Sequence, residues 1–146
     1  MTTPDYIEPF IGWKGLLADS DGRLYSPAVH TEWPAREPLV AKCDRSDSHM
    51  PPHPQCSCGV YALDTFETLR RHGYNWQEAA EPGERWVIVE VNLWGEVRKG
   101  QVGFRTHLAY PKTVYVPAHI YAIGNAIRLR YGVPLRFIDR FTGERN

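Results

Sequence analysis

The strongest constraint on this chain is a short loop, from Cys43 to Gly59, that holds all three of its cysteines and two of its six histidines. Cys43, His49, Cys56 and Cys58 follow the spacing C-x5-H-x6-C-x-C, which lets one loop wrap a single ion. Thiolate and imidazole are the ligands that zinc prefers, and four of them complete a tetrahedral site. An odd number of cysteines argues against a disulfide framework. The sequence therefore predicts a zinc site in this loop.

The histidine ligand has two candidates. A six-residue gap to Cys56 lets the loop fold back from His49, whereas His53 is held between Pro52 and Pro54. We therefore favour His49 and keep His53 as the alternative. Four protein ligands leave no open position for water, so the expected ion is structural rather than catalytic. The competing interpretation is that the cysteines are small buried hydrophobic residues.

The chain of 146 residues has the size and composition of one domain, with 42% hydrophobic and 23% charged residues. We expect a single domain over 1–146, with a core over about 11–135 and a charged C-terminal tail over 136–146. No apolar run is long enough to suggest a membrane span, and the N-terminus lacks the pattern of a secretion signal. These features predict a cytoplasmic protein that does not contact a membrane.

The pattern of strand and helix signals is typical of an α+β fold, in which an antiparallel sheet or meander is combined with a mid-chain helix and a C-terminal helix. Asp21-Gly22 lies between two apolar runs and predicts a hairpin. Strands are expected over 39–41, 59–62, 86–98, 102–110 and 113–116. Residues 74–83 are expected to form a loop.

Capping signals set the expected ends of the two helices. Asp64 or Thr65 would cap the mid-chain helix, which runs to Arg71 and stops at Gly73. Pro117 suits the first turn of the C-terminal helix, which would run to about 131 before a glycine and a proline. The last residues, 135–146, would form the charged tail, with one apolar docking segment at 137–138.

Candidate catalytic residues are few. Glu90 lies among apolar residues of a strand, and Glu96 follows a glycine near a strand end. Either carboxylate could act as a base together with Arg105 or His107. No P-loop, Rossmann glycine pattern, zinc-protease helix or nucleophile elbow is present in the sequence. The chain therefore has no complete catalytic motif.

Charge is unevenly distributed although the formal net charge is zero. Residues 1–90 carry 8 basic and 14 acidic side chains, whereas residues 91–146 carry 9 basic and 3 acidic ones. Such asymmetry can mark a surface for nucleic acid or another partner. The candidate binding residues are Arg98, Lys99, Arg105 and Lys112, which occupy the same run of strands as several aromatic residues. The alternative is that the two halves of the chain neutralise each other on folding.

The motifs support a resemblance to a known family. HxxPxxxCxCGVYA begins at His49, LWGxV begins at Leu93, and GxRxxxAYP begins at Gly103. In these motifs the chain resembles a family of small uncharacterised proteins of actinobacteria and their phages. The resemblance covers about residues 11–135, includes an upstream cysteine at Cys43 and a Gly-Trp-Lys start at Gly12, and implies that His49 is the family histidine. The family has no assigned activity.

Together these features predict a small cytoplasmic, phage-related binding or accessory protein that is stabilised by a structural zinc ion. Its expected partner is a host protein or a nucleic acid, and its oligomeric state is left open. The alternative is a small hydrolase or transferase that uses Glu90 or Glu96 with Arg105 or His107. The segment at Gly59 faintly resembles ADP-ribosyltransferase folds, which is an analogy at the level of fold alone.

Overall fold

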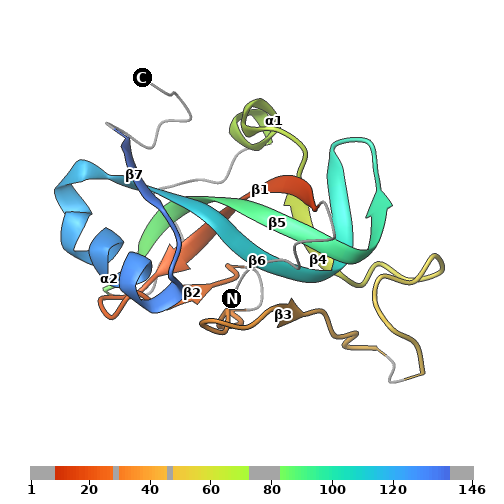
Figure 1. Ribbon diagram of the computed structural model, residues 1–146. Helices are drawn as coiled ribbons and strands as arrows, with labels where there is room; N and C mark the ends of the chain where they lie inside the picture. The colour runs from red at the N-terminus through yellow and green to blue at the C-terminus, as the bar shows by residue number, and fades with distance from the viewer. Residues whose placement is uncertain (1–8, 28–29, 46–47, 73–82, 139–146) are drawn as a thin grey trace.

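The computed structural model describes residues 9–27, 30–45, 48–72 and 83–138 and shows a mixed α+β architecture (Figure 1). The strands are β1 (Phe10–Ala18), β2 (Leu24–Tyr25), β3 (Leu39–Val40), β4 (Val60–Leu63), β5 (Arg85–Lys99), β6 (Gly103–Pro117) and β7 (Leu135–Ile138). The helices are α1 (Phe66–Arg71) and α2 (Tyr121–Tyr131), the latter preceded by a 3₁₀ turn, η1 (Ala118–Ile120). No helix in the described part of the chain is long and apolar enough to cross a membrane.

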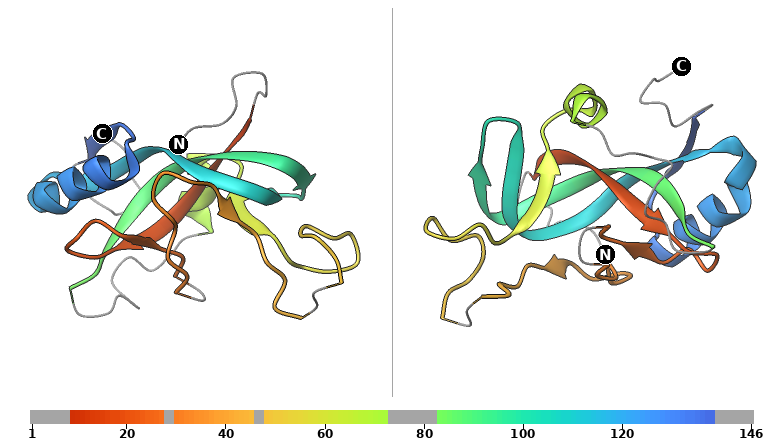
Figure 2. Two further views of the ribbon diagram at one scale, coloured as in Figure 1. Left: turned by 60° about the horizontal axis from the view of Figure 1, so that its bottom comes forward. Right: turned by 180° about the vertical axis from the view of Figure 1, so that it is seen from behind.

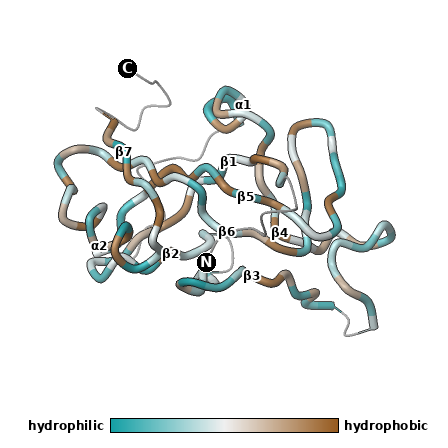
Figure 3. The backbone as a smooth tube through the Cα atoms, in the orientation of Figure 1, coloured by the Kyte–Doolittle hydropathy of each residue, from teal (hydrophilic) through white to brown (hydrophobic). Residues whose placement is uncertain are grey.

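The long antiparallel hairpin of β5 and β6 forms the centre of the sheet. Alternation of apolar residues along β5 puts Val87, Val89 and Val91 into the larger core cluster and Ile88 into the smaller one. The two clusters therefore occupy opposite faces of this strand. Hydrophobic residues accordingly follow the strands through the middle of the sheet (Figure 3). The strand predicted over 86–98 is confirmed.

Both edges of the hairpin are occupied. β1 pairs with β5 over nine residues, while the free edge of β6 pairs in succession with β4, β3 and β7. β1 also meets β4 at one position, Trp13 opposite Leu63, so β1, β5, β6 and β4 form a closed circuit. Close approach of β4 and β6 depends on Gly103, because a Cβ atom there would lie 2.2 Å from the carbonyl oxygen of Ala62. The predicted meander is thus only part of the topology.

The two helices flank the sheet near the residues predicted for them. Thr65 caps α1 by accepting a hydrogen bond from the amide of Thr68, and Leu69 packs into the smaller core cluster. Gly132 ends α2 in the left-handed conformation with φ 68°, as the sequence indicates. Ile127 and Tyr131 of α2 are buried in the larger cluster. Gly73 and the predicted loop at 74–82 lie outside the described residues.

Three local predictions are corrected by the structure. Residues 103–117 form one strand, with an irregularity beside Pro111, rather than two strands. Pro117 ends this strand and precedes η1, so it does not lie within the first turn of an α-helix. Leu135–Ile138 pairs in parallel with Val114–Pro117 and belongs to the sheet, not to a charged tail. The long strand and the strand at Leu135–Ile138 both depend on pairing with distant segments, which no local signal reports.

A buried tyrosine ties α2 to the N-terminal hairpin. The hydroxyl of Tyr131 accepts a hydrogen bond from the amide of Leu24 at 2.9 Å and donates one to the carbonyl of Trp33 at 2.7 Å. Burial raises the pKa of Tyr131 to about 12. The phenol therefore stays neutral and can serve both partners over the whole physiological range.

Tyr131→Phe should destabilise the protein by about 1–3 kcal/mol, because a buried donor and a buried acceptor lose their partner. Urea denaturation should show a lower midpoint with an unchanged slope. Tyr121→Phe, at an exposed position on the same helix, is the matched control and should leave the midpoint unchanged. Equal midpoints for the two variants would show that the Tyr131 hydroxyl does not stabilise the fold.

Candidate metal centre

The fold brings four ligand atoms of the Cys/His loop together. One ligand atom from each of Cys43, His49, Cys56 and Cys58 lies within 4.8 Å of the other three. The Sγ atoms of Cys43 and Cys56 are 3.6 Å apart, and Cys58 Sγ is 3.4 Å from Nε2 of His49. All three cysteines are free thiols. This group could bind one metal ion.

The structure places His53 beside the group rather than in it. Its ring stacks on that of His49, with the ring centroids 4.5 Å apart. Nδ1 of His53 accepts a hydrogen bond from the amide of Gln55 at 3.1 Å. His53 thus lies against the face of the His49 ring and outside the group of four ligand atoms.

The guanidinium group of Arg105 holds the backbone of the loop through hydrogen bonds. It donates to the carbonyl oxygens of Cys56 at 2.7 Å and Cys58 at 2.8 Å, and more weakly to that of His53 at 3.3 Å. On the same strand, two residues further on, Nδ1 of His107 donates to the carbonyl of Pro51 at 3.1 Å. Residues i and i+2 of a strand share a face. One face of β6 therefore serves as the platform on which the loop rests.

Strands flank the ligands on both sides. β3 precedes Cys43, β4 begins shortly after Cys58, and both strands pair with β6. Gly59 lets the chain turn from the last ligand into β4, since its φ is +126°, a conformation that other residues rarely adopt. Figure 2 shows the loop extending outward from the ends of β3 and β4. Its two ends are fixed by the sheet.

The two neighbouring thiols differ in acidity. A hydrogen bond from the backbone amide of Cys58 lowers the pKa of Cys56, whereas desolvation raises the pKa of Cys58. A thiolate is the form that binds metal. Cys56 is therefore the easier of the two to deprotonate, and a bound cation would favour the thiolate of both.

Neither candidate carboxylate forms an ion pair with Arg105 or His107 among the described residues. Glu90 accepts a hydrogen bond from the hydroxyl of Tyr115 at 3.5 Å, and Glu96 forms an ion pair with Arg98 at 3.2 Å. Arg105 and His107 donate hydrogen bonds to backbone carbonyls of the Cys/His loop. The two carboxylates thus have partners other than Arg105 and His107.

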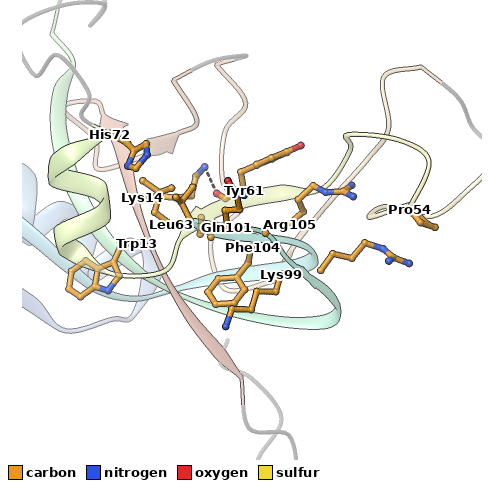
Figure 4. Close-up of a pocket in the computed structure, with 15 residues that line it drawn as sticks. Trp13, Lys14, Pro54, Tyr61, Leu63, His72, Lys99, Gln101, Phe104 and Arg105 are labelled. Atoms are coloured by element: carbon orange, nitrogen blue, oxygen red, sulfur yellow. Dashed lines mark hydrogen bonds between the residues drawn. The ribbon is translucent and has the colours of Figure 1, made fainter.

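Three of the four candidate binding residues line a common hollow, drawn in Figure 4. These are Arg98, Lys99 and Arg105. Lys112 lies further along β6, exposed, beside the irregularity at Pro111. Lys14 also lines the hollow and was not among the predicted residues. One sequence feature does point to Lys14, because it is the sole charge within the otherwise uncharged run Phe10–Ala18.

Comparison with known proteins does not assign the chain to a family. No protein-family model, curated protein or solved structure matches it.

Replacing Arg105 should weaken metal binding without removing a ligand. We expect Arg105→Gln to lower the affinity for Zn²⁺ or Co²⁺ by about 10- to 100-fold, the usual effect of losing a group that orients the ligands. Competition with a chromogenic chelator measures this. Lys112→Gln removes an exposed charge from the same strand and should leave the affinity unchanged. The same affinity in both variants would mean that Arg105 does not organise the site.

Proposed function

We propose that this chain is a zinc-stabilised, phage-related binding domain without catalytic activity of its own, which acts on a host protein or a nucleic acid. The observation that carries the zinc assignment is the convergence of Cys43, His49, Cys56 and Cys58. Three thiols and one imidazole match the ligand set of closed structural zinc sites. The sequence resemblance supplies the phage setting.

Interatomic distances support the choice of zinc. Zinc lies about 2.3 Å from sulfur and about 2.0 Å from nitrogen in tetrahedral sites, which puts two sulfurs about 3.8 Å apart and a sulfur and a nitrogen about 3.5 Å apart. The Cys43–Cys56 separation is 3.6 Å and the Cys58–His49 separation is 3.4 Å. Soft thiolates also disfavour magnesium and calcium, which prefer oxygen ligands.

A binding role is favoured over an enzymatic one. A catalytic base must lie within hydrogen-bond reach of the groups with which it works. Glu90 and Glu96 instead contact Tyr115 and Arg98, respectively. A closed set of four protein ligands also leaves no position at which the ion could activate a water molecule. The basic side chains gathered at the β5–β6 hairpin offer a surface to an anionic partner.

The zinc assignment is tested by metal analysis of two histidine variants. We expect one zinc ion per chain in the native protein and in His53→Ala, and a loss of the ion in His49→Ala. Structural zinc contributes roughly 10 kcal/mol or more of binding free energy, which is coupled to folding. Chelation should therefore lower the thermal midpoint of the native protein and of His53→Ala.

The two histidine variants control for each other because their rings stack and both lie in the same loop. Native protein without stoichiometric zinc, and with a thermal midpoint that chelation leaves unchanged, would refute the structural ion. Loss of zinc from His53→Ala alone would transfer the ligand role to His53.

A further inference from the structure

The charged side chains that line the hollow near the turn of the β5–β6 hairpin are all positive. Figure 4 draws the residues that line it. Its volume is about 720 Å³, within the range of roughly 300–1,000 Å³ that is typical of small-molecule sites. Among the described residues that line it there is no aspartate or glutamate, but there are four strong cations: Lys14, Arg98, Lys99 and Arg105. We call this hollow the cationic pocket. Its size and charge fit an organic anion.

Strand pairing forces two of these cations together. Arg105 of β6 lies directly opposite Arg98 of β5. Directly opposed side chains project from one face of a sheet, and like charges at such positions destabilise the pair. Arg98 has an ion pair with Glu96, yet its Nε atom is buried with no hydrogen-bond partner among the described residues. The hydrogen bonds of Arg105 go to uncharged carbonyl oxygens.

The third cation is almost entirely buried. Lys14 is 9% exposed, and its Nζ donates one hydrogen bond, to the carbonyl of Tyr61 at 2.6 Å. An ammonium group has three donors, and no carboxylate of the described residues forms an ion pair with this one. Desolvation lowers the pKa of Lys14 to about 8. An anion in the pocket would offset the cost of burying this charge.

An aromatic ring stands beside the cations. Tyr61 of β4 pairs with Arg105 on the edge of β6 opposite to Arg98, so the three residues form one row across the sheet. The side chain of Tyr61 is 48% exposed, and its hydroxyl donates to the carbonyl of Ser57, which fixes the ring. Exposed aromatic rings stack on nucleobases, and arginine forks bind phosphate oxygens.

We propose that the cationic pocket binds a nucleotide unit, with its phosphate at Lys14, Arg98 and Arg105 and its base against Tyr61. The inference deepens the proposed binding role and rests on it, because it names the chemistry of the partner. A free mononucleotide and a nucleotide within a single strand offer the same phosphate and base. Both sources are therefore tested.

The experiment titrates zinc-loaded protein with AMP by calorimetry and with a fluorescein-labelled (dT) octamer by anisotropy. We expect saturable binding of at least one probe. Lys14→Met and Arg98→Gln should each weaken it by about 10- to 100-fold, the effect of losing a charged hydrogen-bond donor. Arg128→Gln is the matched control, because Arg128 is exposed on α2 at the opposite end of the sheet from the hairpin turn (Figure 1).

Each outcome is decisive. Binding of AMP would indicate a pocket for free nucleotides, and binding of the octamer alone would indicate a site for single strands. The absence of saturable binding of either probe at concentrations up to about 1 mM would overturn the proposal. Equal weakening by Arg128→Gln, or none by the pocket variants, would also overturn it. If Lys14→Met fails to fold, Arg98→Gln alone decides.

Zinc content, measured on the same samples, separates this inference from the proposed function. Full zinc occupancy with no binding of either probe would refute the nucleotide pocket and leave the zinc assignment intact. Native protein that contains no zinc and still binds a probe would refute the zinc assignment and leave the nucleotide pocket intact.

Discussion

Hydrogen bonding along both edges of β6 is the constraint on which the rest of the structure depends. One edge pairs with β5, and the other pairs in turn with β4, β3 and β7. A strand has only two edges, so these three short segments share one of them, and each occupies the part that the others leave. β7 pairs with the C-terminal part of β6, near α2. β3 and β4 pair with its N-terminal part and position both ends of the Cys/His loop there. Core, metal loop and pocket all take their positions from this strand.

The metal group and the cationic pocket are linked through Arg105 and β4. Arg105 holds carbonyl oxygens of the loop and also lines the pocket. Cys58 lies two residues before β4, so an ion that holds this thiolate would also fix the start of the strand that carries Tyr61. A zinc ion bound here would thus order the loop beside the pocket, even though its four protein ligands would leave it closed to substrate.

Local signals predicted most of the elements because they depend on neighbouring residues only. Alternation along β5, the threonine cap of α1 and the glycine that ends α2 all act within a few residues. The errors have a common origin. Pro111 is a local breaker that predicts two strands within residues 103–117, yet β6 runs past it because distant segments pair with both of its edges. The short segment at Leu135 became a strand for the same reason.

The sequence by itself determined the three thiols and the two candidate histidines of the loop, since spacing and residue type within 16 residues suffice to wrap one ion. The structure placed His49, not His53, beside the thiols. The sequence also determined that the C-terminal part carries an excess of positive charge. Only the tertiary structure decided which cations meet. Lys14 and Arg98 are 84 positions apart in the sequence, and both line the pocket with Arg105 because β1, β5 and β6 pair through long-range hydrogen bonds. A shift of one residue in strand register would move each side chain to the other face of the sheet. The local sequence does not report the register, so it could not reveal that these cations line one pocket.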